Sequence, residues 1–144
     1  MATVREILAR KGNAVVTAEA GQTVLEAARI MNGHGIGAVV VTEQGEMRGI
    51  FTERDMLRRV VAEARDPKAT RLAEVMTPSV VTTVDQTTAE ECAELMTVRR
   101  IRHLPVMADG HLAGIVTIGD LLAWQLQEQA TTITQLNGFI YDNR

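Results

Sequence analysis

The stretch "GIFTERDML" at residues 49–57 returns as "GIVTIGDLL" at residues 114–122. A shift of 65 residues, applied without gaps, aligns residues 14–57 with residues 79–122, and fifteen of these 44 pairs are identical. Self-similarity of this kind is typical of a repeated supersecondary unit. The sequence therefore predicts two copies of one unit, joined by "EARDPKATR" at residues 63–71, where a proline and mixed charges indicate a linker.

Composition limits what the chain can be. Its 144 residues are 46% hydrophobic with a net charge of −3, which suffices for a buried core and disfavours bulk attraction to nucleic acid or anionic membranes. No apolar run approaches the ~20 residues that cross a bilayer, and the first residues lack the apolar stretch of a secretion signal. A single cysteine, Cys92, excludes an internal disulfide. We expect a cytoplasmic protein without a metal site.

Each copy reads first as a strand followed by a helix. The β-branched runs at residues 14–17 ("AVVT") and 79–82 ("SVVT") predict strands. Thr23 with Glu26, and Thr88 with Glu91, match the capping box that starts a helix. Apolar residues then recur at the i, i+3, i+4, i+7 spacing of a buried helix face. These faces comprise Val24, Ala27, Ala28 and Met31 in the first copy and Ala89, Cys92, Ala93 and Met96 in the second.

A β-hairpin and a second helix complete each copy. Residues 36–42 and 47–52, like 101–107 and 112–117, are apolar runs separated by a glycine-containing turn. The second helix starts at Thr52 or Thr117, and short lead helices are predicted at residues 4–8 and 72–76. The buried face of this second helix is predicted to comprise Met56, Leu57, Val60, Val61 and Ala64 in the first copy and to run from Leu121 onward in the second. The fold class is α+β, with two three-stranded sheets that pack on each other.

The C-terminal segment contains more apolar residues than this small fold needs. Leu122, Leu126, Ile133, Leu136 and Ile140 follow a roughly 4-3-4 spacing that Gln129 breaks. Asn137–Gly138 is expected to interrupt the helix. We expect this helical tail to cover a neighbouring subunit or its own flank, and the chain to form a homodimer.

The Thr-x-x-Asp motif has two interpretations that can hold together. Thr52 and Thr117 can cap a helix, with Asp55 and Asp120 favouring the positive end of its dipole. Alternatively, the free N–H groups and the threonine hydroxyl at such a helix start can hold a phosphate. The carboxylate would repel a phosphate but suits two adjacent ribose hydroxyls. The motif therefore also predicts a nucleotide site.

The paired β-α-β-β-α copies, each ending in Gly-hydrophobic-x-Thr-x-x-Asp-hydrophobic, resemble cystathionine-β-synthase (CBS) domains. The resemblance covers residues 3–128 and implies a pseudo-twofold pair with clefts between the copies. We place the first repeat and its lead helix at residues 1–66, the second at 67–128 and a helical tail at 129–144. Family members often bind AMP, ADP, ATP, NAD(H) or S-adenosylmethionine, and pairs commonly dimerise. AMP or NAD(H) is the ligand that we expect first.

The resemblance also implies roles for single residues. Asp55 and Asp120 would bind ribose, and Thr52 and Thr117 would bind phosphate. Arg102 and His103, predicted on a strand, would reach the phosphate, with Arg54 a weaker candidate. Arg99 and Arg100 instead fall at a helix end, where cations offset the dipole. Adenine would lie against apolar residues whose other interpretation is ordinary core: Val15, Val16, Val80, Val81, Ile36, Ile101 and Pro105.

The motifs give little support to an enzyme. The sequence has no nucleophile elbow, no phosphate-binding Walker loop and no metal motif, and no histidine stands at a fixed spacing from the Thr-Asp pairs. We therefore expect a non-catalytic sensor of an adenine nucleotide that acts on a separate, unidentified protein. The alternative is a structural or dimerisation module that binds no ligand.

Overall fold

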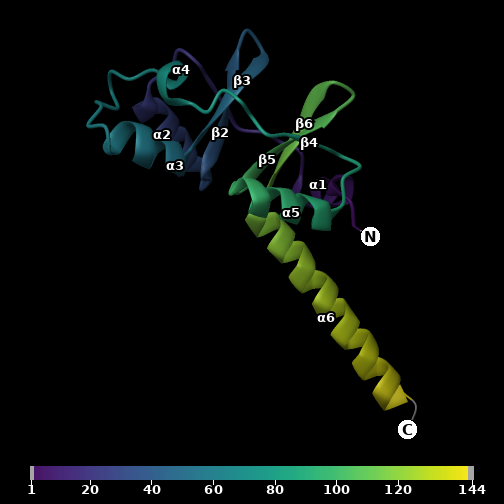
Figure 1. Ribbon diagram of the computed structural model, residues 1–144. Helices are drawn as coiled ribbons and strands as arrows, with labels where there is room; N and C mark the ends of the chain where they lie inside the picture. The colour runs from purple at the N-terminus through teal and green to yellow at the C-terminus, as the bar shows by residue number, and fades with distance from the viewer. Residues whose placement is uncertain (1, 143–144) are drawn as a thin grey trace. The chain divides into compact units, whose positions relative to one another are not determined.

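A computed structural model describes the backbone of residues 2–142 and the side chains of residues 2–136. Its elements are shown in Figure 1 and run along the chain as α1 (Val4–Lys11), β1 (Thr17–Glu19), α2 (Val24–His34), β2 (Ala38–Glu43), β3 (Glu46–Thr52), α3 (Glu53–Asp55), the π-helix η1 (Met56–Val61), α4 (Leu72–Val75), β4 (Thr83–Val84), α5 (Ala89–Arg99), β5 (His103–Ala108), β6 (His111–Thr117) and α6 (Ile118–Asp142). They form two compact units. The middle unit is Ala14–Val81, and the terminal unit joins Met1–Asn13 to Thr82–Arg144.

Each unit has one three-stranded sheet, in the order β1-β2-β3 or β4-β5-β6, which confirms the α+β class. In each sheet the first strand runs parallel to the second, and the other two form an antiparallel hairpin. Both hairpins turn at two residues with positive φ, Gln44–Gly45 at 54° and 79° and Asp109–Gly110 at 52° and 78°. Such a turn matches the right-handed twist of the flanking strands. The predicted hairpins are confirmed.

The first strand of each sheet begins later than predicted. Val15 and Val16 precede β1, and Val80 and Val81 precede β4, in irregular backbone. One hydrogen bond extends the ladder back before β1, from the Val40 N–H to the Val16 carbonyl at 3.3 Å. A β-branched run therefore marked the neighbourhood of each strand but placed its start too early.

The first helices have the predicted caps. Thr23 and Thr88 accept hydrogen bonds from the N–H groups of Glu26 and Glu91 at 3.2 and 3.1 Å. Val24, Ala27 and Met31 of α2 are buried, as are Cys92 and Met96 of α5. The helical segment after β3 departs from the prediction. Among the five residues predicted to form its buried face, only Val60 is buried, and Met56 is half-buried. Leu57 and Val61 are 62% and 64% exposed and Ala64 is also exposed, so these three were wrongly assigned to the core.

The short helix before each repeat packs in the unit that holds the strands of the other repeat. The N–H groups of Val4 and Arg5 in α1 donate to the carbonyls of Thr87 and Asp85 in the terminal unit, at 2.8 and 2.9 Å. In the middle unit, Leu72 and Ala73 of α4 donate likewise to the carbonyls of Gln22 and Ala20. The compact units therefore differ from the repeats drawn at 1–66 and 67–128, because α1 completes the second repeat and α4 the first.

A bulge in each hairpin places a glycine beneath the segment that precedes the first strand of a repeat. We call these two segments, residues 4–11 and residues 72–77, the lead segments. The register shifts between Val41 and Thr42 and between Val106 and Met107, and the bulged strands carry Gly49 and Gly114 opposite. A β-carbon on Gly49 would lie 2.7 Å from both the Met76 Sδ and the Thr77 backbone oxygen, whereas the three atoms nearest to one on Gly114 are Leu8 side-chain carbons, the closest at 2.8 Å. Glycine thus lets each lead segment approach its sheet.

The tail is one continuous helix. α6 runs from Ile118 to Asp142 and passes through Asn137–Gly138, where an interruption was expected. One glycine in a helix interior costs only about 1 kcal/mol, which the remaining hydrogen bonds of a long helix can offset. The side chain of Ile140 lies outside the described residues.

We expect Gly49→Ala to destabilise the chain by about 1–3 kcal/mol, because the clash includes backbone. Gly114→Ala should cost less, because the tips of a leucine side chain can rotate away. Urea unfolding of both variants checks this order. Equal losses would show that the lead segment does not constrain the bulge.

Candidate functional site

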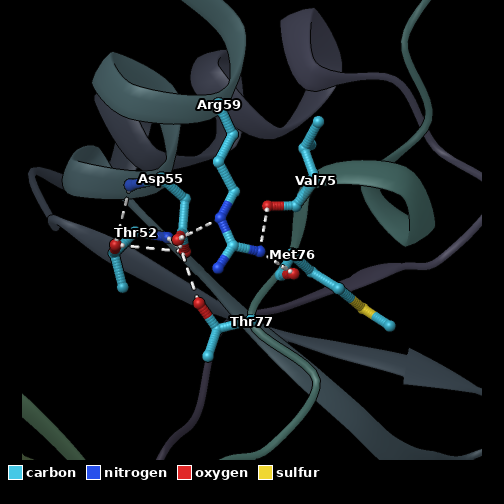
Figure 2. Close-up of polar contacts among 6 residues, drawn as sticks. All are labelled: Thr52, Asp55, Arg59, Val75, Met76 and Thr77. Carbon is cyan, nitrogen blue, oxygen red and sulfur yellow. Dashed lines mark hydrogen bonds and ion pairs between the residues drawn. The ribbon is translucent and has the colours of Figure 1, made fainter.

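The Thr-x-x-Asp motif of the middle unit forms the junction between β3 and α3. Thr52 Oγ1 accepts from the Asp55 N–H at 3.2 Å, and Asp55 Oδ2 accepts from the Thr52 N–H at 3.0 Å and from its hydroxyl at 3.2 Å (Figure 2). This reciprocal pair is a capping box with aspartate in place of the usual glutamate. The capping interpretation is therefore confirmed for this copy.

Asp55 also holds the lead segment of its unit. Its Oδ1 accepts from the Thr77 hydroxyl at 2.9 Å and lies 3.7 Å from the Arg59 Nε, and Arg59 Nη1 donates to the Met76 carbonyl at 2.7 Å (Figure 2). Both carboxylate oxygens thus have partners, and the Asp55 side chain is only 8% exposed. A carboxylate has about four acceptor sites, so these contacts leave it little capacity for a ribose.

The second motif forms the same junction between β6 and α6. Thr117 Oγ1 accepts from the Asp120 N–H at 3.1 Å, and Asp120 Oδ2 accepts from the Thr117 N–H at 2.8 Å. The remaining partner is different, because Lys11, the last residue of α1, places its Nζ 2.7 Å from Asp120 Oδ2 and donates to the Ile115 carbonyl at 2.7 Å. The Asp120 and Lys11 side chains are 21% and 30% exposed. This ion pair is accessible to solvent.

The two helix starts also differ in the residues on the neighbouring strand. The Ile118 N–H of α6 donates to the Arg102 carbonyl at 3.0 Å, and His103 lies directly opposite Thr117 in the β5–β6 ladder. In the middle unit the same positions are Gly37, whose carbonyl accepts from the Glu53 N–H, and Ala38, opposite Thr52. Arg102 is exposed and precedes β5, so its predicted place on the strand is wrong by one residue.

The other candidate residues divide between the units. Val15, Val16, Ile36, Val80 and Val81 belong to the middle unit and are half-buried, whereas Ile101 (half-buried) and Pro105 (buried) belong to the terminal unit. Val16 and Ile36 pack against the core of their unit, which agrees with their alternative interpretation as ordinary core residues. Arg54 is exposed in α3. Arg99 ends α5, and Arg100 is its left-handed C-cap, as expected of helix-end cations.

Three contact residues were not predicted from the sequence. Arg59 follows Asp55 by four positions, a spacing at which helical ion pairs form, and could have been found from that signal. Lys11 and Thr77 are far from the motifs along the chain and have no motif of their own. Only the docking of the lead segments brings them to the carboxylates.

The described residues offer no metal centre, since none of their His, Cys, Asp and Glu side chains gather in a group of three or more. Burial raises the pKa of the Cys92 thiol, which opposes formation of a reactive thiolate. Among the helices that the structure describes, none combines the length and apolar character needed to cross a membrane. What remains at both helix starts is a capped junction with a carboxylate.

The two carboxylates should differ in their contribution to stability. We expect Asp55→Ala to lower the free energy of unfolding by about 2–3 kcal/mol, because it leaves the half-buried donors of Thr52 and Thr77 without their acceptor. Asp120→Ala should cost about 1 kcal/mol, the usual loss for a helix cap, since its ion pair is partly exposed. Thermal and urea unfolding measure both; a larger loss for Asp120→Ala would contradict this account.

Comparison with known proteins shows the same repeat. The model of the CBS domain matches residues 4–62 and again 72–127. The mitochondrial CBS domain-containing protein CBSX3 of Arabidopsis thaliana is 33% identical over 96% of this chain and 71% of its own length, and the CBS domain-containing protein YhcV of Bacillus subtilis is 37% identical over 81% and 82%. A crystal structure of a CBS-domain-containing protein from Agrobacterium tumefaciens is 40% identical, with a TM-score of 0.82 over 85% of this chain and 98% of its own.

Proposed function

The chain belongs to the CBS domain family, and we propose that it is a regulatory module that binds an adenine nucleotide through its terminal unit. The observation that carries the proposal is that the carboxylates at two equivalent helix starts differ in their exposure and in their partners. At α6, Asp120 is partly exposed, and Lys11, Arg102 and His103 lie on neighbouring segments. At α3, Asp55 is buried and held by its own unit.

This set of groups suits the parts of a nucleotide. The Asp120 carboxylate can accept from two ribose hydroxyls. The start of α6 contributes backbone N–H groups and the positive end of a dipole, and Arg102, His103 and Lys11 can offset phosphate charge. Lys11 now pairs with Asp120, and exchanging that carboxylate for a phosphate would keep the lysine paired while the aspartate turns to the ribose. AMP or NAD(H) is the ligand that we propose first, with ATP, ADP and S-adenosylmethionine as further members of the panel.

We infer a regulatory role and no catalytic one for these groups. Tandem CBS domains are commonly regulatory modules, and the carboxylates here cap helices instead of flanking a reaction centre. We propose that the bound nucleotide alters the contacts this chain makes with a separate protein. A scaffold that binds no ligand is the competing function, and the capping role of both motifs is the observation that favours it.

Nucleotide binding is tested by calorimetry with AMP. Asp120→Asn should weaken binding about ten- to a hundredfold, as for loss of hydrogen bonds to a charged group. Asp55→Asn is the matched control, and it should bind AMP nearly as the parent does once its folding has been confirmed. Loss of affinity in both variants would assign the ligand to both motifs, and the absence of heat for the entire panel would favour the scaffold.

The phosphate assignment has its own test. Arg102→Ala should weaken AMP binding about ten- to a hundredfold and leave adenosine nearly unchanged, because only AMP offers the charge. Arg99→Ala, at an exposed helix end, is the control cation. If AMP and adenosine lose affinity equally in Arg102→Ala, the arginine supports the fold and does not contact phosphate.

We also propose that the chain acts as a homodimer. Leu57 and Val61 are 62% and 64% exposed, and the residues at the equivalent positions of the second repeat, Leu122 and Leu126, are 52% and 65% exposed. Both repeats therefore present an apolar pair on the same helix face, which is typical of an interface. A hexameric CBS-CP12 protein from cyanobacteria, 31% identical to this chain with a TM-score of 0.74, is an example of an oligomeric relative.

Sedimentation tests the dimer. Leu57→Glu with Val61→Glu should raise the dimer dissociation constant at least about tenfold, because apolar contact area is lost and charge is buried. Val98→Glu is the control, since Val98 is 71% exposed but lies outside the repeated pair. A parent chain that stays monomeric at micromolar concentration contradicts the proposal.

A further inference from the structure

α6 carries an apolar seam formed by Leu122, Leu126, Gln129, Ile133 and Leu136, which Ile140 continues in the sequence. The spacing is 4-3-4-3-4, the 3.5-residue period of a helix that packs against another helix. The four apolar members whose side chains are described are 52–65% exposed. The family model ends at residue 127, so most of the seam lies beyond the CBS domains.

The opposite side of α6 is the side that contacts its own unit. The Arg10 guanidinium of α1 lies 4.5 Å from the centroid of the Trp124 ring, and Arg10 also donates to Gln127. Trp124 and Leu126 are two residues apart, or about 200° around a helix. Figure 1 shows α6 continuing past the other elements of the terminal unit, and the side chains of residues 131–136 are all exposed. The seam therefore needs a partner from outside this unit.

We propose that the seam pairs with α6 of a second copy, parallel and in register, as a two-stranded coiled coil. This deepens the homodimer proposed above. The first argument is charge: from Leu121 to Tyr141 the only charged residue is Glu128, and the positions flanking the seam are uncharged, among them Ala123, Gln125, Ala130 and Thr132. Partner choice between different chains relies on charges at these flanking positions, whereas identical helices meet here without like-charge repulsion.

The second argument is the order of residue types along the seam. With Leu126, Ile133 and Ile140 at a positions, Leu122, Gln129 and Leu136 fall at d. In parallel coiled coils, β-branched residues at a with leucine at d favour two strands, and Ile133 and Ile140 at a with Leu122 and Leu136 at d follow this order. Gln129 specifies the register, because a side-chain amide both donates and accepts and can pair with the same amide of the other chain. An antiparallel pairing centred on the seam would instead place Gln129 against Ile133.

Disulfide trapping tests the orientation and register. All variants carry Cys92→Ala, which removes the buried thiol. Alanine is the residue at the equivalent position of the first repeat, Ala27. In this background Leu136→Cys should form a disulfide-linked dimer in a glutathione buffer at least about tenfold faster than Thr131→Cys, because only seam residues meet their own copies within the ~7 Å that a disulfide spans. Both positions are exposed, so neither variant should disturb the fold.

Equal rates at the two positions, or no cross-link at either, would overturn the coiled coil. Mixing Leu126→Cys with Leu136→Cys chains adds a test of direction, since predominance of the mixed disulfide would indicate antiparallel helices and also overturn the proposal. Sedimentation separates this result from the homodimer itself. A chain that is dimeric but does not cross-link at residue 136 supports the homodimer and overturns the coiled coil. A monomeric chain overturns both proposals.

Discussion

The junction between the last strand of each sheet and the helix after it depends on one hydrogen-bonded pair. A carboxylate three residues into the helix accepts the threonine N–H at the strand end, and the threonine hydroxyl accepts the N–H of the same aspartate. These bonds satisfy donors that a helix start otherwise leaves open. They also fix where the chain turns from the hairpin into the helix. The repeat of the motif is therefore first a repeat of a structural junction.

What differs between the units is the residue that the lead segment brings to this junction. In the middle unit the lead segment contributes the Thr77 hydroxyl, and Asp55 is buried among donors of its own unit. In the terminal unit α1 contributes the Lys11 ammonium, and Asp120 stays partly exposed. The Thr77 hydroxyl adds a donor to a carboxylate that is already buried, whereas the Lys11 ammonium forms an ion pair with a carboxylate that stays accessible to solvent. The same backbone architecture thus supports one structural and one accessible carboxylate.

The sequence was sufficient for the features that depend on local chemistry. The 65-residue shift, the threonine caps and the Gly45 and Gly110 turns predicted both hairpins and the helices around them, and the resemblance to CBS domains was confirmed.

Prediction from the sequence failed where the burial or the partners of a residue depend on distant segments. Leu57 and Val61 lie one position from the residues that face the core, and a wide apolar stripe does not reveal which edge is buried. The partners of the carboxylates were missed because Lys11 and Thr77 reach them only through docking of the lead segments. The roles assigned to Thr52, Thr117, Arg54, Arg102, His103 and the adenine-wall residues stay predictions.

The proposed site and the proposed coiled coil are linked because both begin on α6. Its first turn carries Asp120, whose carboxylate is held by Lys11 of α1, and its second turn carries Trp124, against which Arg10 of α1 stacks. Replacing the Lys11 contact by a ligand would therefore change one of the contacts that hold α1 against α6, while the Arg10 contacts with Trp124 and Gln127 could remain. The seam begins on the far side of the same two turns, at Leu122 and Leu126. If α6 borders a nucleotide site at its first turn and pairs with a second copy along its length, as proposed, ligand binding can alter the arrangement of the dimer directly. This requires that the ligand binds the two arrangements with different free energies.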